Sequence, residues 1–181
     1  MSDPSGPPDA AADPAAGPLT DHPSVVRVRE ALAAYGASGA VVTLDEIAPT
    51  AASAAGQLGI GVAQIANSLV FAVPDDAAPG GRRALLVLTS GAHRVDTRKV
   101  AALVGAPRLE RADPEFVRER TGFAIGGVAP VGHSAPLQTL VDVALAEHDQ
   151  VWASAGHPRT VFPTSFEELV RITGGQATEV A

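Results

Sequence analysis

The residues best suited to chemistry lie in one glycine-rich stretch, TGFAIGGVAPVGH, which runs from Thr121 to His133 and contains four glycines. Gly126 and Gly127 are consecutive, and Pro130 restrains the chain where it leaves them. Glycine lets a ligand approach the main chain closely. A rigid loop of this kind presents N–H groups to an anion or to the oxyanion of a tetrahedral intermediate. We expect the Gly126–Gly127 backbone to bind an oxyanion; a tight turn between buried elements is the simpler alternative.

Three small groups of polar residues interrupt or follow apolar runs of the chain. Polar groups at strand ends that face one glycine-rich loop form a pocket with converging hydrogen bonds, so each group is a candidate for substrate binding. The simpler alternative for each serine is a loop or cap role, and Trp152 is expected in the core rather than against a substrate. The groups are Asn67 with Ser68, then Ser90, Gly91 and His93, then Ser154, Gly156 and His157.

Several familiar catalytic motifs are missing from the sequence. There is no GxGxxG after a strand, no P-loop lysine motif, no HExxH and no GxSxG. The five histidines lack the spacing of metal ligands, so we predict no metal and no cofactor. A zinc site built from distant histidines is a weaker alternative. A Ser-His-Asp triad stays open, although no serine lies in a nucleophile-elbow context.

Composition restricts the class of protein. The chain of 181 residues has a net charge of −7, which argues against binding DNA or any duplex through bulk electrostatics but leaves recognition of a short RNA end open. With no cysteine there is neither a disulfide nor a thiolate nucleophile. No apolar run is long enough to span a membrane and no secretory signal is visible, so a cytoplasmic location is expected.

Local signals predict the elements that would position these residues. Residues 1–20 are rich in Pro, Ala, Asp and Gly and are predicted to be a disordered tail, which leaves residues 21–181 as one domain. Helices are expected from Pro23 to Gly36, from the cap Thr50 to residues 56–59, from Asp96 to Gly105, from Asp113 to Gly122, and from a capping box of Thr164 and Glu167 to Ile172.

The same signals predict strands that interleave irregularly with these helices. Residues 64–73 and 83–88 are apolar runs joined by a turn and predict a hairpin, which a polar loop, residues 89–94, then leaves. This order favours an α/β (α+β) domain with a mixed sheet over a doubly wound parallel one. The remaining strands are expected at residues 39–44, 108–111, 137–143, 150–154, 160–162 and 177–180.

Four motifs in this order, QIANSLVF, VLTSGAHRVD, TGFAIGGVAPVGH and WASAGH, resemble the YbaK/prolyl-tRNA-synthetase-associated domain family over roughly residues 22–181. The resemblance implies a single α/β domain with a curved, mainly antiparallel sheet flanked by helices. It also implies hydrolysis of wrongly charged aminoacyl-tRNA. The expected partners are a tRNA acceptor end that carries an amino acid and an aminoacyl-tRNA synthetase.

The resemblance also implies roles for single residues. Gly126 and Pro130 match the family's GxxxP loop, whose backbone contacts the aminoacyl ester, while Ser154 and Gly156 match a second loop of the pocket. Asn67 stands where many members carry a lysine. Asparagine supplies no positive charge, and the nearby His93 and Arg94 are candidates to compensate.

The implied mechanism needs a positioned water, an oxyanion site and a pocket for the side chain, but no protein nucleophile. In this family a ribose hydroxyl of the terminal adenosine is thought to activate the water or to attack directly. Asn67 and Ser154 are expected to orient the ester and the amino acid. The alternative, suggested by the missing lysine, is a non-catalytic module of the same fold that binds tRNA or another ligand.

Overall fold

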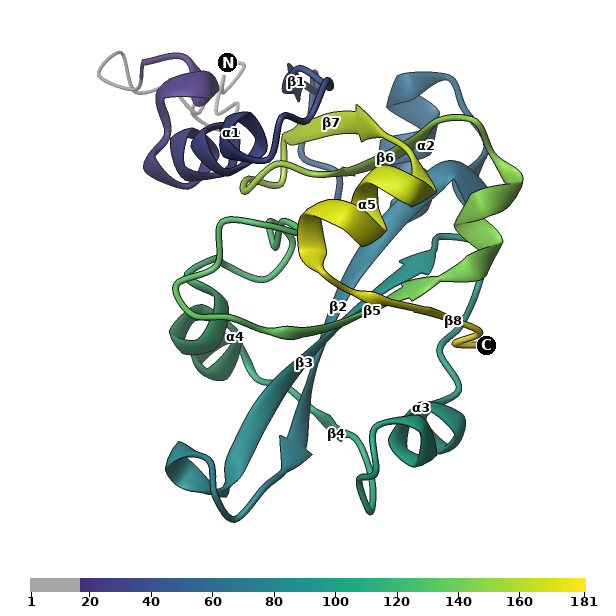
Figure 1. Cartoon of the computed structure of the whole chain (residues 1–181). Coiled ribbons are helices and arrows are strands. Elements are labelled where there is room, and N and C mark those ends of the chain that lie inside the picture. The colour runs from purple at the N-terminus through teal and green to yellow at the C-terminus, as the bar shows by residue number, and fades with distance from the viewer. Residues whose placement is uncertain (1–16) are drawn as a thin grey trace, which may run out of the picture.

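A computed structural model describes residues 17–181 (Figure 1). The predicted tail falls mainly on residues 1–16, which lie outside the described residues. Its last two residues, Leu19 and Thr20, belong to a 3-10 turn, η1 (Leu19–Asp21). Arg29 holds this turn against the next helix, because its guanidinium donates to the Thr20 carbonyl at 3.3 Å.

One mixed sheet forms the centre of the domain. Within residues 17–181 it has eight strands in the order β1-β7-β6-β2-β3-β5-β8, with β4 beside β2. Four pairings are antiparallel and three are parallel, which confirms the predicted mixed α/β fold. The strands are β1 (Val42–Thr43), β2 (Ile65–Pro74), β3 (Arg82–Ser90), β4 (Glu110–Arg111), β5 (Gln138–Asp142), β6 (Val151–Ser154), β7 (Thr160–Thr164) and β8 (Gln176–Thr178).

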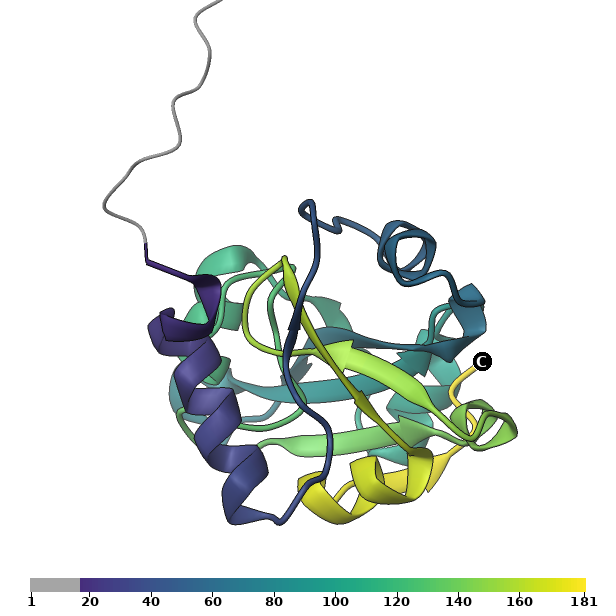
Figure 2. The ribbon, with the colours of Figure 1, turned by 90° about the horizontal axis from the view of Figure 1, so that it is seen from above.

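Helices cover both faces of this sheet, and Figure 2 shows α1 and α2 on opposite sides of it. Side chains of α1 join the main core, which includes Val28, Leu86 and Phe162. Those of α2 join a separate cluster around Ile65. The helices are α1 (Pro23–Ala34), α2 (Ala51–Leu58), α3 (Thr97–Leu103), α4 (Pro114–Thr121) and α5 (Phe166–Thr173), with 3-10 turns η2 (Val62–Gln64), η3 (Pro79–Gly81) and η4 (Val143–Glu147).

Most predicted helix ends are confirmed by their caps. The side chains of Thr50, Asp96 and Asp113 each accept from main-chain N–H groups of the first turn. Gly122 ends α4 with a φ of 79°, in the left-handed region that glycine adopts without strain. These signals are local, which explains why they could be recognised in the sequence.

Four local predictions are wrong. The strand expected at residues 39–44 shrinks to Val42–Thr43, because β1 is a short edge strand that pairs only with β7. Tyr35 follows Val25, Val28 and Leu32 at helical spacing and was therefore expected on the buried face of the first helix, but 49 % of its surface is exposed. Ser90 ends β3 rather than starting a loop. Helix α5 is capped by Ser165, which accepts from the Glu168 N–H, and not by the predicted pair of Thr164 and Glu167.

A gap along one edge of β2 positions the candidate site. Strand β6 pairs with β2 only at Ile65 and Ala66, and β4 pairs with it only at Phe71 and Ala72. No described strand pairs with this edge at residues 67–70. The Ile65 carbonyl accepts from the Gly91 N–H on the β3 side of the strand. The main-chain groups of successive residues point to alternate edges of a strand, so those of Ser68 point toward the gap.

Candidate functional site

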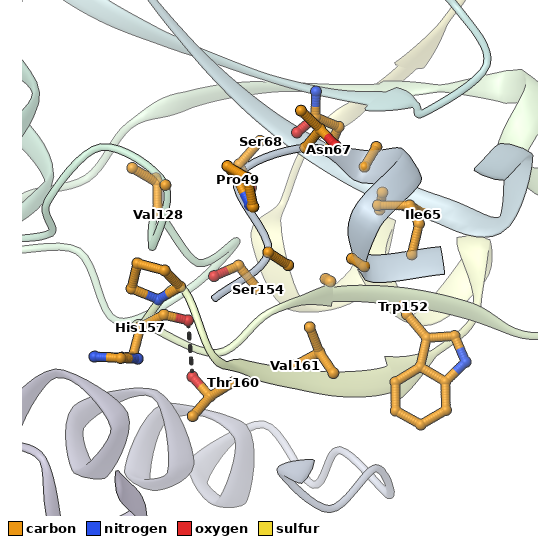
Figure 3. Close-up of a pocket in the computed structure, with 18 residues that line it drawn as sticks. Pro49, Ile65, Asn67, Ser68, Val128, Trp152, Ser154, His157, Thr160 and Val161 are labelled. Atoms are coloured by element: carbon orange, nitrogen blue, oxygen red, sulfur yellow. Dashed lines mark hydrogen bonds between the residues drawn. The ribbon is translucent and has the colours of Figure 1, made fainter. Parts of the chain in front are cut away.

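A small pocket of about 100 Å³ opens where β2 and β6 diverge. Four segments line it: β2, the start of α2 with the residues before it, the glycine-rich loop, and β6 with the turn into β7. Figure 3 shows Ser154 near the centre, with Pro49 and Ser68 above it and Val128 on the glycine-rich side. Five of the predicted site residues line this pocket: Asn67, Ser68, Gly126, Ser154 and His157.

Strand register brings Asn67 and Ser154 together. Ile65 pairs with Trp152 and Ala66 pairs with Ala153 in the parallel β2–β6 ladder. One step further along both strands, Asn67 therefore lies beside Ser154 on the face that carries α2, since side chains alternate between faces.

Two buried hydroxyl groups of the pocket have no hydrogen-bond partner. The oxygen atoms of Ser68 and Ser154 are both buried and unpaired among the described residues. Most buried polar side-chain atoms in proteins have a partner, and a buried hydroxyl without one costs about 1–3 kcal/mol. Two such groups in one pocket indicate that a ligand or water supplies the missing hydrogen bonds.

The glycine-rich stretch is a loop that closes on Thr121. The Thr121 hydroxyl donates to the Val117 carbonyl at 2.7 Å and accepts from the Phe123 N–H at 3.0 Å. At the far end, Ser134 N–H donates to the Thr121 carbonyl at 3.1 Å. Arg27 of α1 adds a hydrogen bond to the Gly122 carbonyl at 2.8 Å. Both ends of the loop are therefore fixed at one buried threonine.

The two central glycines of the loop differ in whether their N–H groups are already hydrogen-bonded. Gly126 lines the pocket with a φ of 88°, and its N–H takes part in no main-chain hydrogen bond among the described residues, like that of Val128. The Gly127 N–H already donates to the Ala124 carbonyl at 3.0 Å. Gly127 instead allows close packing, because a Cβ there would lie 3.1 Å from the Gly156 carbonyl oxygen. The Gly127 N–H is therefore not free to bind an oxyanion, whereas no main-chain hydrogen bond among the described residues uses the N–H groups of Gly126 and Val128.

Gly156 also allows close packing and does not line the pocket. Its φ is 101°, and an added Cβ would lie 2.7 Å from the Ser24 carbonyl oxygen of α1. The neighbouring His157 does line the pocket, although Figure 3 shows its ring on the far side of its backbone from Ser154. Its Nδ1 accepts from the Arg159 N–H at 3.0 Å, which fixes one tautomer of the neutral ring.

The pocket holds no permanent charge. His157 is its one titratable side chain, and partial burial lowers the pKa of that imidazole, helped by the charges of His22 and Arg159. The ring is therefore neutral near pH 7. Among the described residues, no carboxylate and no lysine lines the pocket, so its polar lining consists of hydroxyl, amide and main-chain groups together with the His157 imidazole.

Four predicted site residues lie outside the pocket: Ser90, Gly91, His93 and Pro130. The Ser90 hydroxyl donates to the Ala63 carbonyl at 3.0 Å, and a Cβ on Gly91 would lie 2.5 Å from the Val62 carbonyl oxygen, so both hold η2 against β3. Pro130 is buried on the far side of the loop. Sequence could not exclude these residues from the site, because they follow the same apolar runs as the true lining residues.

His93 belongs to a separate polar cluster at the end of β3. Its Nδ1 lies 2.8 Å from Oδ2 of the buried Asp142. The same oxygen accepts from the Ser90 N–H, and the Oδ1 atom of Asp142 accepts from the Ala144 N–H, at 3.0 Å each. His93 therefore does not replace the positive charge that Asn67 lacks. Among the described residues, no group of three or more His, Cys, Asp or Glu side chains could hold a metal ion.

Several lining residues were not predicted. Pro49, Thr50 and Ala54 close one side from α2, and Val161 closes another from β7. Trp152 packs against the core cluster around Ile65, as expected of a core residue, and it also lines the pocket. Apolar and small residues of this kind carry no chemical signal in a sequence, and only the sheet order places them at the gap.

Comparison with known proteins assigns a family to this arrangement. The profile of the aminoacyl-tRNA editing domain matches residues 45–172. A protein proposed as a trans-editing enzyme for prolyl tRNA synthetase is 44 % identical, with a TM-score of 0.78, over 87 % of this chain and 96 % of that one.

Two further relatives are more distant. The hypothetical protein APE2540 is 28 % identical, with a TM-score of 0.73, over 85 % of this chain and 98 % of its own. The uncharacterised protein YwhH of Bacillus subtilis (strain 168) is 25 % identical over 81 % of this chain and 88 % of its own. No helix within residues 17–181 is long and apolar enough to cross a membrane.

Proposed function

Because the chain belongs to the aminoacyl-tRNA editing domain family, we propose that it hydrolyses the ester of a mischarged aminoacyl-tRNA in the pocket between β2 and β6. The observation that carries the proposal is the pair of buried, unpartnered hydroxyls of Ser68 and Ser154 in that pocket. An aminoacyl ester and its α-amino group supply the hydrogen-bonding atoms that these hydroxyls lack.

The pocket size restricts the acyl group. Its volume of about 100 Å³ is only about three times the ~30 Å³ that one molecule occupies in liquid water. Ala51, Ala54 and Val161 close it with short apolar side chains. The amino acid removed therefore has a small side chain, and larger ones are rejected by overlap with these walls.

The mechanism uses main-chain donors and a water. As the water attacks the ester carbonyl, negative charge develops on the carbonyl oxygen, and the free N–H groups of Gly126 and Val128 stabilise it. Each such donor contributes about 3–4 kcal/mol in enzymes that use an oxyanion hole. With no carboxylate or lysine among the described lining residues, the neighbouring ribose hydroxyl of the substrate relays the proton: it accepts the proton of the water and gives its own to the ester oxygen that leaves. The C–O bond of the ester breaks as the new bond to the water oxygen forms, and the products are the free amino acid and the free ribose hydroxyl of the tRNA. Asn67 orients the ester from β2.

The relative proposed as a trans-editing enzyme for prolyl tRNA synthetase suggests where the substrate arises. We infer that this chain, too, acts in trans in the cytoplasm, on tRNA that a synthetase has released with the wrong amino acid.

A non-catalytic binding module is the second candidate, favoured by Asn67 in place of the usual lysine. Deacylation of a panel of charged tRNAs separates the two. An editing enzyme releases at least one small amino acid, whereas a binding module retains every charged tRNA unchanged.

Two serine variants locate the activity. Ser68→Ala and Ser154→Ala are each expected to slow deacylation about tenfold to a hundredfold, which corresponds to roughly 1.4–2.7 kcal/mol. Neither loses stability, because neither hydroxyl has a partner within residues 17–181. Ser134→Ala, at an exposed site outside the pocket, is the matched control. Parental rates in both pocket variants would contradict the proposed site.

A further inference from the structure

The start of α1 lies against the turn between β6 and β7, and we propose that two histidines at this contact hold one wall of the acyl pocket in place and release it in mild acid. The histidine pair is His22, the cap of α1, and His157, which lines the pocket. His22 does not line the pocket, so it acts as a positioning residue. This inference rests on the proposed function.

Two close contacts hold α1 against this turn. The rings of His22 and His157 meet edge to face, with 5.3 Å between their centroids and 61° between their planes. Beside them, a Cβ added at Gly156 would lie 2.7 Å from the Ser24 carbonyl oxygen, so the main chain of the turn lies directly on the first turn of α1. Figure 3 shows the His157 ring directed away from Ser154, toward the ribbon of α1.

Both rings act as hydrogen-bond acceptors, which requires the neutral form. Nδ1 of His22 accepts from the Ser24 N–H at 3.2 Å, and Nδ1 of His157 accepts from the Arg159 N–H at 3.0 Å. A ring nitrogen that accepts carries no proton, so the proton of each neutral ring is on Nε2. An imidazolium has a proton on both nitrogens. Protonation therefore breaks the cap of α1 at one ring and the link that closes the 157–159 turn at the other.

The charges around the pair do not compensate a proton on it. Arg159 is held in the same turn, where its guanidinium donates to the Leu44 carbonyl at 3.1 and 3.0 Å. The facing part of the glycine-rich loop, residues 122–132, has no titratable side chain. Within residues 17–181, no carboxylate forms an ion pair with either ring. The other charged side chains of the adjoining segments are Asp21, Arg27, Arg29, Glu30, Asp45 and Glu46.

Mild acid therefore favours release of the turn. Burial lowers the pKa of His157 from its ordinary value of 6.5, and the charges of His22 and Arg159 add to this shift. The released ring binds a proton more tightly than the packed ring, so the turn stays packed above about pH 6.5 and is released as the pH falls below it. One packed contact holds both rings, so release by the first proton frees the second ring and the two protons bind cooperatively.

Release disturbs the pocket on two sides. The turn follows Ser154, the last residue of β6. It also supports the glycine-rich loop, because a Cβ on Gly127 would lie 3.1 Å from the Gly156 carbonyl oxygen. Ser154 and the loop that carries Gly126 thus lose support in the same step. Deacylation should therefore decline in mild acid with the steepness of two protons rather than one.

Asparagine variants test the role of each ring. An Asn side chain accepts from the main-chain N–H two residues further on, as each ring does, but it does not titrate. We follow kcat/KM from pH 8 to pH 5.5 on a charged tRNA that the parental protein deacylates, each protein relative to its own rate at pH 8. In His22→Asn and in His157→Asn, the decline per pH unit should be about tenfold smaller than in the parental protein, because one proton fewer is taken up.

A matched control separates the pair from other histidines. His148→Asn removes a titrating ring at the end of η4 that does not line the pocket, and it should keep the parental decline. Circular dichroism at each pH verifies that every protein is folded. A parental decline in His22→Asn overturns the inference, because His22 can influence the reaction only through the pair.

Amide NMR decides the inference without catalysis. As the pH falls from 7.5 to 5.5, the amide protons of Ser24 and Arg159 should move upfield with a common midpoint, since each loses its acceptor. In His22→Asn, the Arg159 amide should titrate with a Hill slope of about 1 instead of about 2. Unchanged amide shifts, or an unchanged slope in His22→Asn, overturn the inference. A parental protein that deacylates nothing but shows the coupled titration disproves the proposed hydrolysis and leaves the histidine pair standing.

Discussion

Asn67 is the residue in which the chemistry of this chain departs most from the expected pattern. Register places it beside Ser154 in the acyl pocket, and its amide makes no side-chain hydrogen bond among the described residues. An amide donates and accepts but carries no charge. The residue therefore orients the ester in our mechanism and does not stabilise its charge.

Two substitutions at this position test that role. Asn67→Ala removes the hydrogen bonds to the ester and should slow deacylation about tenfold, with circular dichroism and melting temperature unchanged. Asn67→Lys supplies a charge beside the developing oxyanion and should retain or raise activity on at least one misacylated tRNA. Steady-state kinetics on the substrates that the parental protein accepts measure both. Parental rates for Asn67→Ala on all of them would remove Asn67 from the mechanism.

His133 should make stability depend on pH. Burial lowers the pKa of this imidazole; the hydrogen bond to the Ala129 carbonyl, at 2.7 Å, opposes this shift, and the charge of Arg27 adds to it. The unfolded chain therefore binds the proton more readily, so the free energy of unfolding falls as pH drops below about 6.5. The loss is at most about 1.4 kcal/mol per pH unit for one histidine.

The substitution His133→Gln keeps a donor to Ala129 but removes the titration. Melting temperatures between pH 7.5 and pH 5 should decline less in this variant than in the parental protein. His148→Gln, whose side chain makes no hydrogen bond among the described residues, should keep the parental decline. Equal declines in all three proteins would assign the pH dependence to other groups.

At the scale of elements, the sequence predicted features that depend on local signals, but it did not predict how distant strands pair. Thr50, Asp96 and Asp113 mark helix starts because a cap acts within one turn, and the β2–β3 hairpin follows from two apolar runs joined by a short turn. The parallel pairing of β6 with β2 joins segments more than 80 residues apart and leaves no local trace.

The same limit explains which site residues were predicted. Asn67, Ser68, Gly126 and Ser154 stand out as polar or glycine residues within apolar runs, and the structure brings them together. His93 stands out equally, yet its ring contacts Asp142 of β5, on the side of β3 that faces away from β2 and the pocket.

The glycine-rich loop offers an element-scale test. Thr121→Val leaves the Phe123 N–H buried without an acceptor and should cost about 1–3 kcal/mol in urea unfolding. Thr173 forms the same pair of bonds at the end of α5, to the Leu169 carbonyl at 2.6 Å and from the Gly175 N–H at 3.0 Å. Thr173→Val should lose similar stability.

Only the first of these variants should lose activity beyond its loss of stability. The Thr121 hydroxyl fixes the start of the loop that carries Gly126, whereas Thr173 lies in α5 and does not line the pocket. Deacylation at a temperature where both variants are fully folded makes the comparison. Equal activity in the two variants would show that the loop does not need this fixed start to bind the oxyanion.

At the scale of the whole chain, the first 16 residues should be dispensable for stability. Their sequence contains no Val, Leu, Ile, Phe, Tyr or Trp, so they offer little to bury. Deleting residues 1–16 should leave the melting temperature unchanged. Deleting residues 1–22 also removes His22, whose ring accepts from the Ser24 N–H at 3.2 Å and caps α1, and should cost about 1 kcal/mol. A lower melting temperature after the shorter deletion would show that this segment binds the domain.

The net charge of the chain restricts how it can bind RNA. With a net charge of −7, the protein as a whole repels a polyanion, so attraction must come from single exposed arginines such as Arg111 of β4. A single-stranded end that contacts about three of them gives a slope of log affinity against log salt near −2, because each contact adds about −0.7. Arg111→Gln should make the slope shallower by roughly 0.7, whereas Arg29→Gln should not change it. KM for the aminoacyl-tRNA, measured from low to physiological salt under conditions where it equals the dissociation constant, gives the slope. A slope steeper than about −5 would mean that the tRNA body also binds a broad basic surface, which the distribution of unpaired arginines in residues 17–181 does not provide.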